Sequence, residues 1–403
     1  MMAVPQTAGV HTLILYGNCG GYLAPCGCTS PMSGGIVRAG KVIKELSASG
    51  DSHLLLLGGY VAGAGRQDQL KAEALGEFAR TVRAAGMEFS SDVAALGPGE
   101  LLELDQLSAH AVFSSSVSDT PSQDLKPTVN AGPFLVGSVT RSPDRFAGAV
   151  QGRPVRTEMA IANLLDEAKA EGRLPVLVTD EDEAGAVELA EKHPDLAVVV
   201  YRSTTAPPKE LRKVGGVVLA TTGFRGKAVV SLSYDGNNLR SYDVEDLGPD
   251  VPNDKETSEV YDGYLRRVQK ENLLAQWPRS PSASFAGSGA CAPCHATAYK
   301  TWSHSGHARA YRDLETQGHG ADPDCVSCHV VGLSSQRGFY SQAKTPQLAS
   351  VGCESCHGPG RAHALSPRRV SLIKASFKTC AGCHTLDNSP GFNVKEYWPQ
   401  IYH

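Results

Sequence analysis

The chain has 403 residues, of which 41% are hydrophobic and 20% charged, with a formal net charge of −4. This length exceeds one ordinary domain and the composition suits buried cores, so we expect two globular domains and a linker. The acidic balance argues against nucleic-acid binding. No apolar run approaches the roughly 18 residues that cross a bilayer. The longest runs, 53–61 and 196–201, have the length of buried strands.

Residues 10–245 alternate short β-rich runs with helical stretches, which predicts an α/β domain. The helices are expected at 69–85 and 183–192. The expected strands are HTLILY, HLLLLGG, VLVTD, LAVVVY, GGVVLATT and AVVSLSY. Residues 251–277 become polar and helical, and RSPSASFAGSGA then predicts a flexible joint. We therefore expect a first domain at 1–250, a linker at 251–285 and a second, mainly helical domain at 286–403.

The late cysteines form four CxxCH segments, namely CAPCH at 291–295, CVSCH at 325–329, CESCH at 353–357 and CAGCH at 380–384. In such a segment both thiols form thioethers with heme vinyl groups, and the histidine coordinates the iron. A zinc cluster or a disulfide scaffold would leave the histidine of each segment unexplained. The pattern thus predicts four covalently bound c-type hemes. Their attachment residues are Cys291, Cys294, Cys325, Cys328, Cys353, Cys356, Cys380 and Cys383, and their proximal ligands are His295, His329, His357 and His384.

Four hemes on the 118 residues from 286 to 403 leave about 30 residues each, too few for a separate core around each heme. We therefore expect the hemes to pack against one another and to form the core. All five methionines lie outside this region, so bis-histidine irons of relatively low potential are expected. The spare histidines are His304, His307, His319, His363 and His403.

His307 is not expected to serve the heme of His295, because a helix of 12 residues between them would rise about 18 Å. It should reach a different heme. The Gly-Pro-Gly turn in HGPGRAH lets His357 and His363 point in different directions, which also suits service to two irons. Distal histidines donated across hemes would make folding depend on heme insertion.

The segments CAPCHATAYKTWSHSGHARA, DCVSCHVVGL and VGCESCHGPGRAH resemble the tetraheme cytochrome c-554 family, over about 290–384. Well-known members of that family accept electrons from hydroxylamine oxidoreductase. The resemblance implies that His307 is the distal ligand of the third heme, that of His357, and that His363 serves the first heme, that of His295. It also implies a distal histidine after the fourth motif, where we assign His403 to the heme of His384. The second heme, that of His329, is five-coordinate in the family; His304 and His319 are possible distal ligands that could close it.

The heme-binding end is basic, with 11 Lys and Arg against 7 Asp and Glu in 286–403. Its cations cluster between the third and fourth motifs, at Arg361, Arg368, Arg369, Lys374 and Lys378. Pairing with heme propionates is the favoured interpretation, and docking of an acidic redox partner is the alternative.

The run LILYGNCGGYLAPCGCTSPMSGGIVRAGKVI resembles the start of the 5′-nucleotidase and metallophosphoesterase family, particularly versions fused to multiheme cytochromes. The likeness continues through DVAALGPGELL, ELAEKHPDLAVVV and ATTGFRGKAVV, over about 10–240. It implies a metallophosphoesterase-like α/β sandwich. Family members bind two metals through Asp and His. The corresponding positions here read Asn18-Cys19-Gly20, Gly59-Tyr60, Pro98-Gly99 and Tyr201-Arg202, so we expect a retained scaffold without phosphatase activity.

Three early cysteines, Cys19, Cys26 and Cys28, lie outside any CxxCH segment, so no fifth heme is expected. In an oxidising compartment we expect a disulfide from Cys19 to Cys26 or Cys28, with a thiolate site for a soft metal as the alternative. Heme attachment to CxxCH happens outside the bacterial cytoplasm. We therefore expect a periplasmic or extracellular protein, although the first residues lack the pattern of a signal peptide, which we expect to have been trimmed or hidden by a misplaced start codon.

The sequence therefore favours an electron-transfer protein over an enzyme, with redox proteins as partners. The alternative is a multiheme oxidoreductase that acts on a small nitrogen compound at an open iron of the His329 heme. The first domain could serve as a docking or assembly module, in a membrane-associated complex or a homo-oligomer.

Overall fold

The computed structural model describes residues 9–25, 32–48, 50–59, 65–88, 112–120, 125–385, 388–389 and 391–403. The chain divides into two compact units, one reaching to Asp262 and the other running from Gly263 to His403. The division falls inside helix α7 (Lys255–Glu271), within the stretch expected to form the linker. No helix among these residues combines the length and the apolar character that a membrane span needs.

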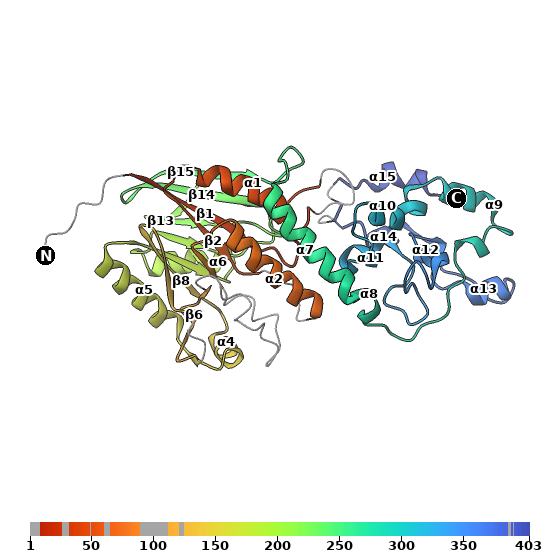
Figure 1. Ribbon diagram of the computed structural model, residues 1–403, viewed down its shortest axis with the longest axis horizontal. Coiled ribbons are helices and arrows are strands. Elements are labelled where there is room, and N and C mark those ends of the chain that lie inside the picture. Colours follow the sequence, from red (N-terminus) through yellow and green to blue (C-terminus); the bar gives the residue numbers. More distant parts are fainter. Residues whose placement is uncertain are drawn as a thin grey trace. The chain divides into compact units, whose positions relative to one another are not determined.

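A first sheet of the first unit contains seven of the described strands, in the order β15-β14-β1-β2-β3-β4-β6 (Figure 1). β1 pairs parallel with β2 and antiparallel with β14, and the pairs from β2 to β6 are parallel. The strands are β1 (Val10–Gly17), β2 (Ser52–Leu57), β3 (Gly86–Glu88), β4 (Val112–Phe113), β6 (Leu125–Lys126), β14 (Ala228–Asp235) and β15 (Asn238–Asp246).

A second sheet has the order β12-β13-β11-β10-β8-β7. Its central strands run parallel, and β12 and β7 at its edges are antiparallel to their neighbours. The strands are β7 (Thr128–Ala131), β8 (Phe134–Val139), β10 (Leu174–Thr179), β11 (Val198–Val200), β12 (Arg212–Val214) and β13 (Val217–Ala220). A separate ribbon pairs β5 (Val117–Ser118) with β9 (Arg153–Pro154).

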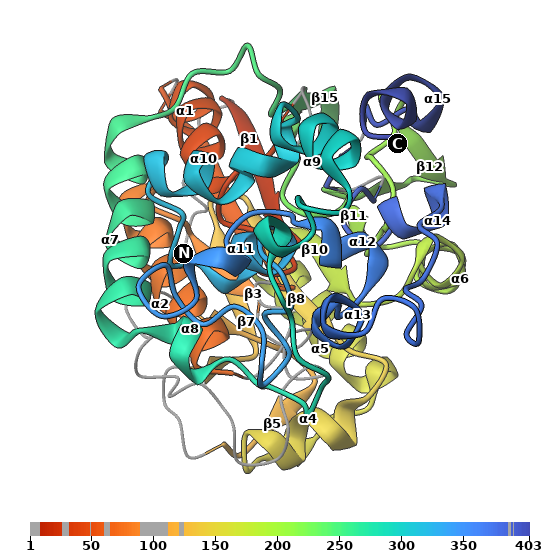
Figure 2. The same ribbon diagram turned by 90° about the vertical axis from the view of Figure 1, so that its right-hand side faces the viewer.

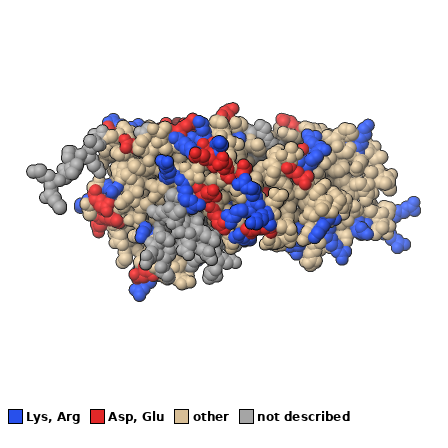
Figure 3. Space-filling view, in the orientation of Figure 1, with Lys and Arg blue, Asp and Glu red and all other residues tan. Residues whose placement is uncertain are grey.

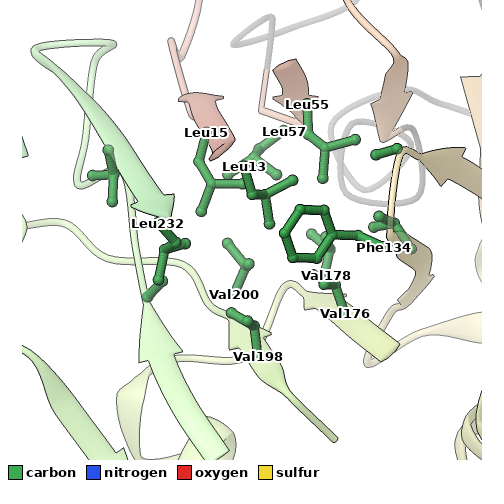
Figure 4. Close-up of a cluster of buried hydrophobic side chains, with 14 of the residues drawn as sticks. Leu13, Leu15, Leu55, Leu57, Phe134, Val176, Val178, Val198, Val200 and Leu232 are labelled. Carbon is green, nitrogen blue, oxygen red and sulfur yellow. The ribbon is translucent and has the colours of Figure 1, made fainter. Parts of the chain in front are cut away.

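The two sheets pack face to face, and helices cover their outer faces. Because side chains alternate along a strand, Leu13 and Leu15 of β1 point into the core between the sheets, where they meet Phe134 and the valines of β10 and β11 (Figure 4). Tyr16 points the other way and contacts Phe78 of α2. The helices of this unit are α1 (Ile36–Ser47), α2 (Arg66–Thr81), α4 (Pro143–Ala149), α5 (Thr157–Glu171) and α6 (Glu183–Lys192).

The expected elements of the first unit are confirmed. All six β-rich runs form strands, and the expected helix at 183–192 is α6. Helix α2 ends at Thr81 instead of residue 85, because Arg83 adopts a left-handed backbone conformation with φ of 55°.

The second unit is built of short helical segments joined by irregular chain (Figure 2). Its α-helices are α8 (Leu273–Gln276), α9 (Ala296–Ser303), α10 (Ala310–Thr316), α11 (Pro323–His329), α12 (Cys353–His357), α13 (Arg361–Leu365), α14 (Phe377–Cys380) and α15 (Val394–Tyr397). The 3-10 turns are η1 (Ser288–Ala290), η2 (Gly306–Arg309), η3 (Pro346–Leu348) and η4 (Trp398–Gln400).

The second unit has a small apolar core of its own, which the expectation of an interior built from hemes did not include. This cluster surrounds the second CxxCH segment and contains Tyr311, Val326, Val331 and Phe339 among its buried members. By contrast, α9, α13, α14 and α15 contain no buried residue. Protein side chains thus form a core around one motif, while the segments around the others bury little of their own surface.

Candidate heme sites and the vestigial metal site

Each CxxCH segment folds as a helical turn. The second and third segments lie in α11 and α12. In the first and fourth, the backbone N–H of the histidine donates to the backbone carbonyl of the first cysteine, from His295 to Cys291 at 2.9 Å and from His384 to Cys380 at 2.8 Å. On a helix, residues three and four apart lie on one face. The turn therefore presents both thiols and the imidazole to the same side, as attachment to one heme requires.

Backbone carbonyls and one hydroxyl orient most of the imidazoles. The contacts are His329 Nδ1 to Ala310 O at 2.9 Å, His357 Nδ1 to Ile373 O at 2.9 Å, His363 Nδ1 to Val370 O at 2.7 Å, His384 Nδ1 to Ser389 Oγ at 3.0 Å and His403 Nδ1 to Ile401 O at 2.8 Å. An Nδ1 that donates to a carbonyl holds the proton, so Nε2 keeps its lone pair for a metal. This is the arrangement that heme-iron ligands need.

Three pairs of histidine rings face each other across a gap. The ring centroids of His295 and His363 are 6.3 Å apart, those of His307 and His384 are 6.2 Å apart, and those of His357 and His403 are 5.9 Å apart. Two imidazoles bound to opposite sides of one metal, each about 2.0 Å from it, have centroids about 6 Å apart. The spacing therefore fits an iron between each pair, and the residues present fit the heme that the sequence implies.

Two of the three expected pairings are exchanged in the structure. His363 faces His295, as expected, but His307 faces His384 of the fourth motif and His403 faces His357 of the third. The peptide of His307 does lie beside the third motif, since its carbonyl accepts a hydrogen bond from Val351 N at 3.1 Å. Its imidazole, however, points to the fourth motif. The His307 ring does not face His295, and the expectation that it serves a heme other than that of His295 stays a prediction.

Burial lowers the pKa of His307, and the nearby His384 and His329 lower it further. The pKa of His384 is also lowered, first by burial and then by His329. A lowered pKa keeps an imidazole neutral near pH 7, which is the form that binds a metal.

The two other candidate ligands lie on either side of α10. His304 ends α9, is exposed, and its Nδ1 lies 2.8 Å from Lys300 O. His319 lies in the turn between α10 and α11, where its N–H donates to Leu314 O. Their roles as possible distal ligands stay predictions.

The four CxxCH motifs are neighbours in space in an order that differs from their order in the sequence. The Cys291 thiol of the first motif lies next to that of Cys353 of the third, and the Cys328 thiol of the second motif lies next to that of Cys383 of the fourth. The charge on Cys380 acts on Cys356, which places the third motif close to the fourth. The attachment points thus follow the order first, third, fourth, second, which differs from their order in the sequence.

Large apolar side chains lie exposed beside the axial histidines. Leu365 is 74% exposed, Ile373 68% and Phe377 59%, all in the segment that carries the carbonyl partners of His357 and His363. Such side chains are suited to cover the apolar faces of a macrocycle.

In the first unit, the ends of parallel strands from both sheets meet around a cavity of about 20 Å³, room for about one water molecule. Asn18, Gly58 and Thr179 follow or end strands there, and Arg202 follows β11. Catalytic and ligand sites of α/β folds occupy such strand ends. This is the place where a metallophosphoesterase fold would hold its metals.

Arg202 is one of the residues that line this cavity. Its Nη1 donates to Asn18 Oδ1 at 3.2 Å, and a Cβ on Gly59 would lie only 2.5 Å from the same nitrogen. Asn18 Nδ2 in turn donates to Gly223 O at 2.6 Å. A fixed positive charge repels a divalent cation. The Pro98-Gly99 position lies outside the described residues.

Sequence reasoning missed Glu88, which ends β3 and is 2% exposed. Its Oε2 accepts a hydrogen bond from Gly58 N at 3.0 Å, so it supports the turn after β2. An acidic residue directly after the apolar start of a buried strand was the available signal.

Cys19 is fully buried, and a Cβ on Gly226 would lie 3.1 Å from its sulfur. Burial raises the pKa of Tyr16 well above its usual value, and the adjacent Cys19 adds to this effect. Cys26 and Cys28 lie outside the described residues, so the disulfide stays a prediction.

Residues 290–358 match the family described as cytochrome c554 and c-prime. Cytochrome c-554 of Nitrosomonas europaea is 35% identical over 94 residues, which is 20% of this chain and 40% of that protein. The match therefore spans less than half of that relative. Over these residues the second unit is similar to a c-type cytochrome, a class of protein whose heme is bound covalently.

The first unit has the fold of the 5′-nucleotidase group. The 5′-nucleotidase precursor of Thermus thermophilus superposes with a TM-score of 0.53 at 18% identity, covering 70% of this chain and 63% of its own length. The sulfate thiohydrolase SoxB of Thermus thermophilus gives 0.52 at 15% identity, covering 67% and 62%. The chain spans less than two thirds of each of these structures. The expected metallophosphoesterase-like fold is confirmed, and these likenesses concern the fold alone.

The ring pairing predicts which heme each distal histidine serves. His307→Ala should convert one low-spin heme to high-spin, because alanine removes a ligand, and low-temperature EPR would show this change. The same substitution in a chain that lacks the fourth heme (Cys380→Ala with Cys383→Ala) should add no high-spin signal. In a chain that lacks the third heme (Cys353→Ala with Cys356→Ala) it should still add one. A high-spin signal added in the chain without the fourth heme, and none added in the chain without the third, would instead support the pairing of His307 with the heme of His357 that the family resemblance implies.

The first unit should not hydrolyse phosphomonoesters, because a guanidinium stands where a metal ligand is needed. The full chain, supplied with manganese or zinc, should give no turnover above a blank and the same melting temperature as with a chelator. Turnover that a chelator abolishes would show that metal ligands remain.

Proposed function

We propose that this chain is an exported tetraheme c-type cytochrome that relays electrons between redox partner proteins. The observation that carries the proposal is the set of three facing histidine pairs, each joining the histidine of a CxxCH segment to a second histidine at the spacing of a six-coordinate iron. With both axial positions filled by protein, such an iron exchanges electrons and does not bind substrate. With histidine in place of methionine, its potential is relatively low.

The contacts between motifs support a path through the hemes. The first and third, the third and fourth, and the second and fourth attachment segments lie next to one another. Hemes held at these segments would form a chain in the order first, third, fourth, second. Electrons would enter at one end of this order and leave at the other.

The basic segment between the third and fourth motifs supports binding of heme propionates. Within the described residues no carboxylate forms an ion pair with any of its cations, which are all exposed. On the face of this unit that Figure 3 shows, basic side chains outnumber acidic ones. The backbone of this segment holds His357 and His363 in place, so its charges lie near the first and third hemes. The cations are Arg361, Arg368, Arg369, Lys374 and Lys378.

The first unit would then act as a docking or assembly module. It keeps the two-sheet fold and its core, while Arg202 and Asn18 hydrogen-bond to each other where metal ligands are expected. Export follows from the heme attachment chemistry, which takes place outside the bacterial cytoplasm. We propose a periplasmic or extracellular location on this ground.

The order of the hemes can be tested by removing one at a time and following reduction by a small soluble donor in a stopped-flow instrument. The intact chain should be reduced in one phase, since neighbouring hemes share electrons faster than donors arrive. Loss of the fourth heme (Cys380→Ala with Cys383→Ala) should split reduction into two phases, because the second heme is then cut off from the first and third.

The matched control removes the second heme (Cys325→Ala with Cys328→Ala), which stands at the end of the order and should leave a single phase. Two phases in the control and one in the fourth-heme variant would contradict the proposed order. A high-spin heme in the intact chain that turns over hydroxylamine or nitrite would replace the relay with the oxidoreductase alternative.

A further inference from the structure

A buried carboxylate lies inside the third CxxCH segment. Glu354, the residue after Cys353, is only 4% exposed, and its side chain accepts three backbone hydrogen bonds. Oε1 accepts from Ala286 N at 2.8 Å and from Gly360 N at 2.6 Å, and Oε2 accepts from Gly287 N at 2.7 Å. Within the described residues no Lys, Arg or His forms an ion pair with it. Burying a carboxylate is unfavourable unless hydrogen bonds replace its contacts with water, and here three backbone N–H groups do so. We therefore examine what these three hydrogen bonds hold in place.

The three donor N–H groups lie in two chain segments that flank the first heme site. Ala286 and Gly287 directly precede η1, which leads into Cys291 and the proximal His295. Gly360 directly precedes α13, which carries His363, the ring that faces His295 at 6.3 Å. The side chain of Glu354 therefore hydrogen-bonds to both segments that lead into the two expected iron ligands of the first heme, His295 and His363.

The backbone around Glu354 is shaped for this contact. Gly287 has a φ of 83°, and a Cβ there would lie 2.8 Å from Gln347 O, so the position requires glycine. A Cβ on Gly360 would lie 3.1 Å from Glu354 Oε1. A further hydrogen bond links the third motif to the segment before the first motif, in which Cys353 N donates to Ser288 Oγ at 3.1 Å.

The charge of Glu354 also reaches the first heme's attachment point. The pKa of Cys291 is raised to about 11, mainly by burial and then by Cys353, and Glu354 adds to the rise. A negative charge near a heme favours the ferric form, which has one more positive charge than the ferrous form, and this lowers the reduction potential.

We propose that Glu354 is a positioning residue that joins the first and third heme sites and lowers the potentials of this pair. The inference rests on the proposed tetraheme function. It adds to that function a residue that sets two of the four potentials.

The test compares Glu354→Gln with Glu396→Gln in the full exported chain. The amide keeps the shape of the side chain but removes its charge and one acceptor. Glu396 is exposed in α15, so its amide variant removes the same charge from a site where water screens it. The readouts are the heme count by pyridine hemochrome, the EPR spectrum and a spectroelectrochemical titration.

In Glu354→Gln two of the four potentials should rise, with the reduced-to-oxidised ratio at a fixed potential increasing about tenfold, or about 59 mV for one electron. In Glu396→Gln all four should stay at their original values. In a His363→Ala background the first heme gains its own high-spin signal, so its titration shows whether it is one of the two that move. Unchanged potentials and spectra in Glu354→Gln overturn the inference.

Loss of heme from Glu354→Gln is also informative, because Glu354→Asp keeps the charge on a shorter side chain. If the glutamine variant loses the first heme and the aspartate variant keeps it, the positioning role is supported. If both variants lose every heme, Glu354 serves general folding and the inference fails. The unsubstituted chain measured in parallel tests the proposed function separately, since fewer than four hemes there would refute the relay whatever the variants do.

Discussion

An iron held between each facing pair of histidines would join parts of the chain that lie far apart in the sequence. The facing pairs are His295 with His363, His307 with His384 and His357 with His403, and the three spans overlap along the chain. A segment would then take its final place when the iron it shares has both ligands. Since α9, α13, α14 and α15 bury no residue of their own, coordination would supply the order that a hydrophobic core supplies elsewhere. Among the described residues of the second unit, an apolar core surrounds the second motif, around Val326 and Phe339.

The first unit shows the reverse situation, since it has an extensive core, and its described residues contain no cluster of three or more His, Cys, Asp or Glu side chains that could hold a metal. Leu13 and Leu55 of one sheet pack against Phe134 and Val176 of the other, so the fold does not depend on a ligand for its stability. Arg202 then brings its own positive charge to the strand ends, where it bonds to Asn18. A fold stabilised in this way would keep its structure whether or not a metal is bound.

The sequence predicted those features that depend on local pattern. The apolar runs of the first unit became strands because alternation and length define a buried strand. The partner of each distal histidine could not be predicted in this way. The peptide of His307 lies beside the third motif while its ring points to the fourth, and no local pattern fixes that direction. Glu354 escaped notice for a similar reason, since its three donors come from residues 286, 287 and 360.

In the proposed tetraheme protein, the eight late thiols are bonded to four hemes, and a histidine of each motif coordinates the iron. The decisive measurement is the intact mass of the chain, purified after export from a bacterium that matures c-type cytochromes. We expect a red protein whose mass exceeds that of the polypeptide by four hemes and stays so under denaturing conditions. A colourless product, or a mass increase of fewer than four hemes, would contradict it.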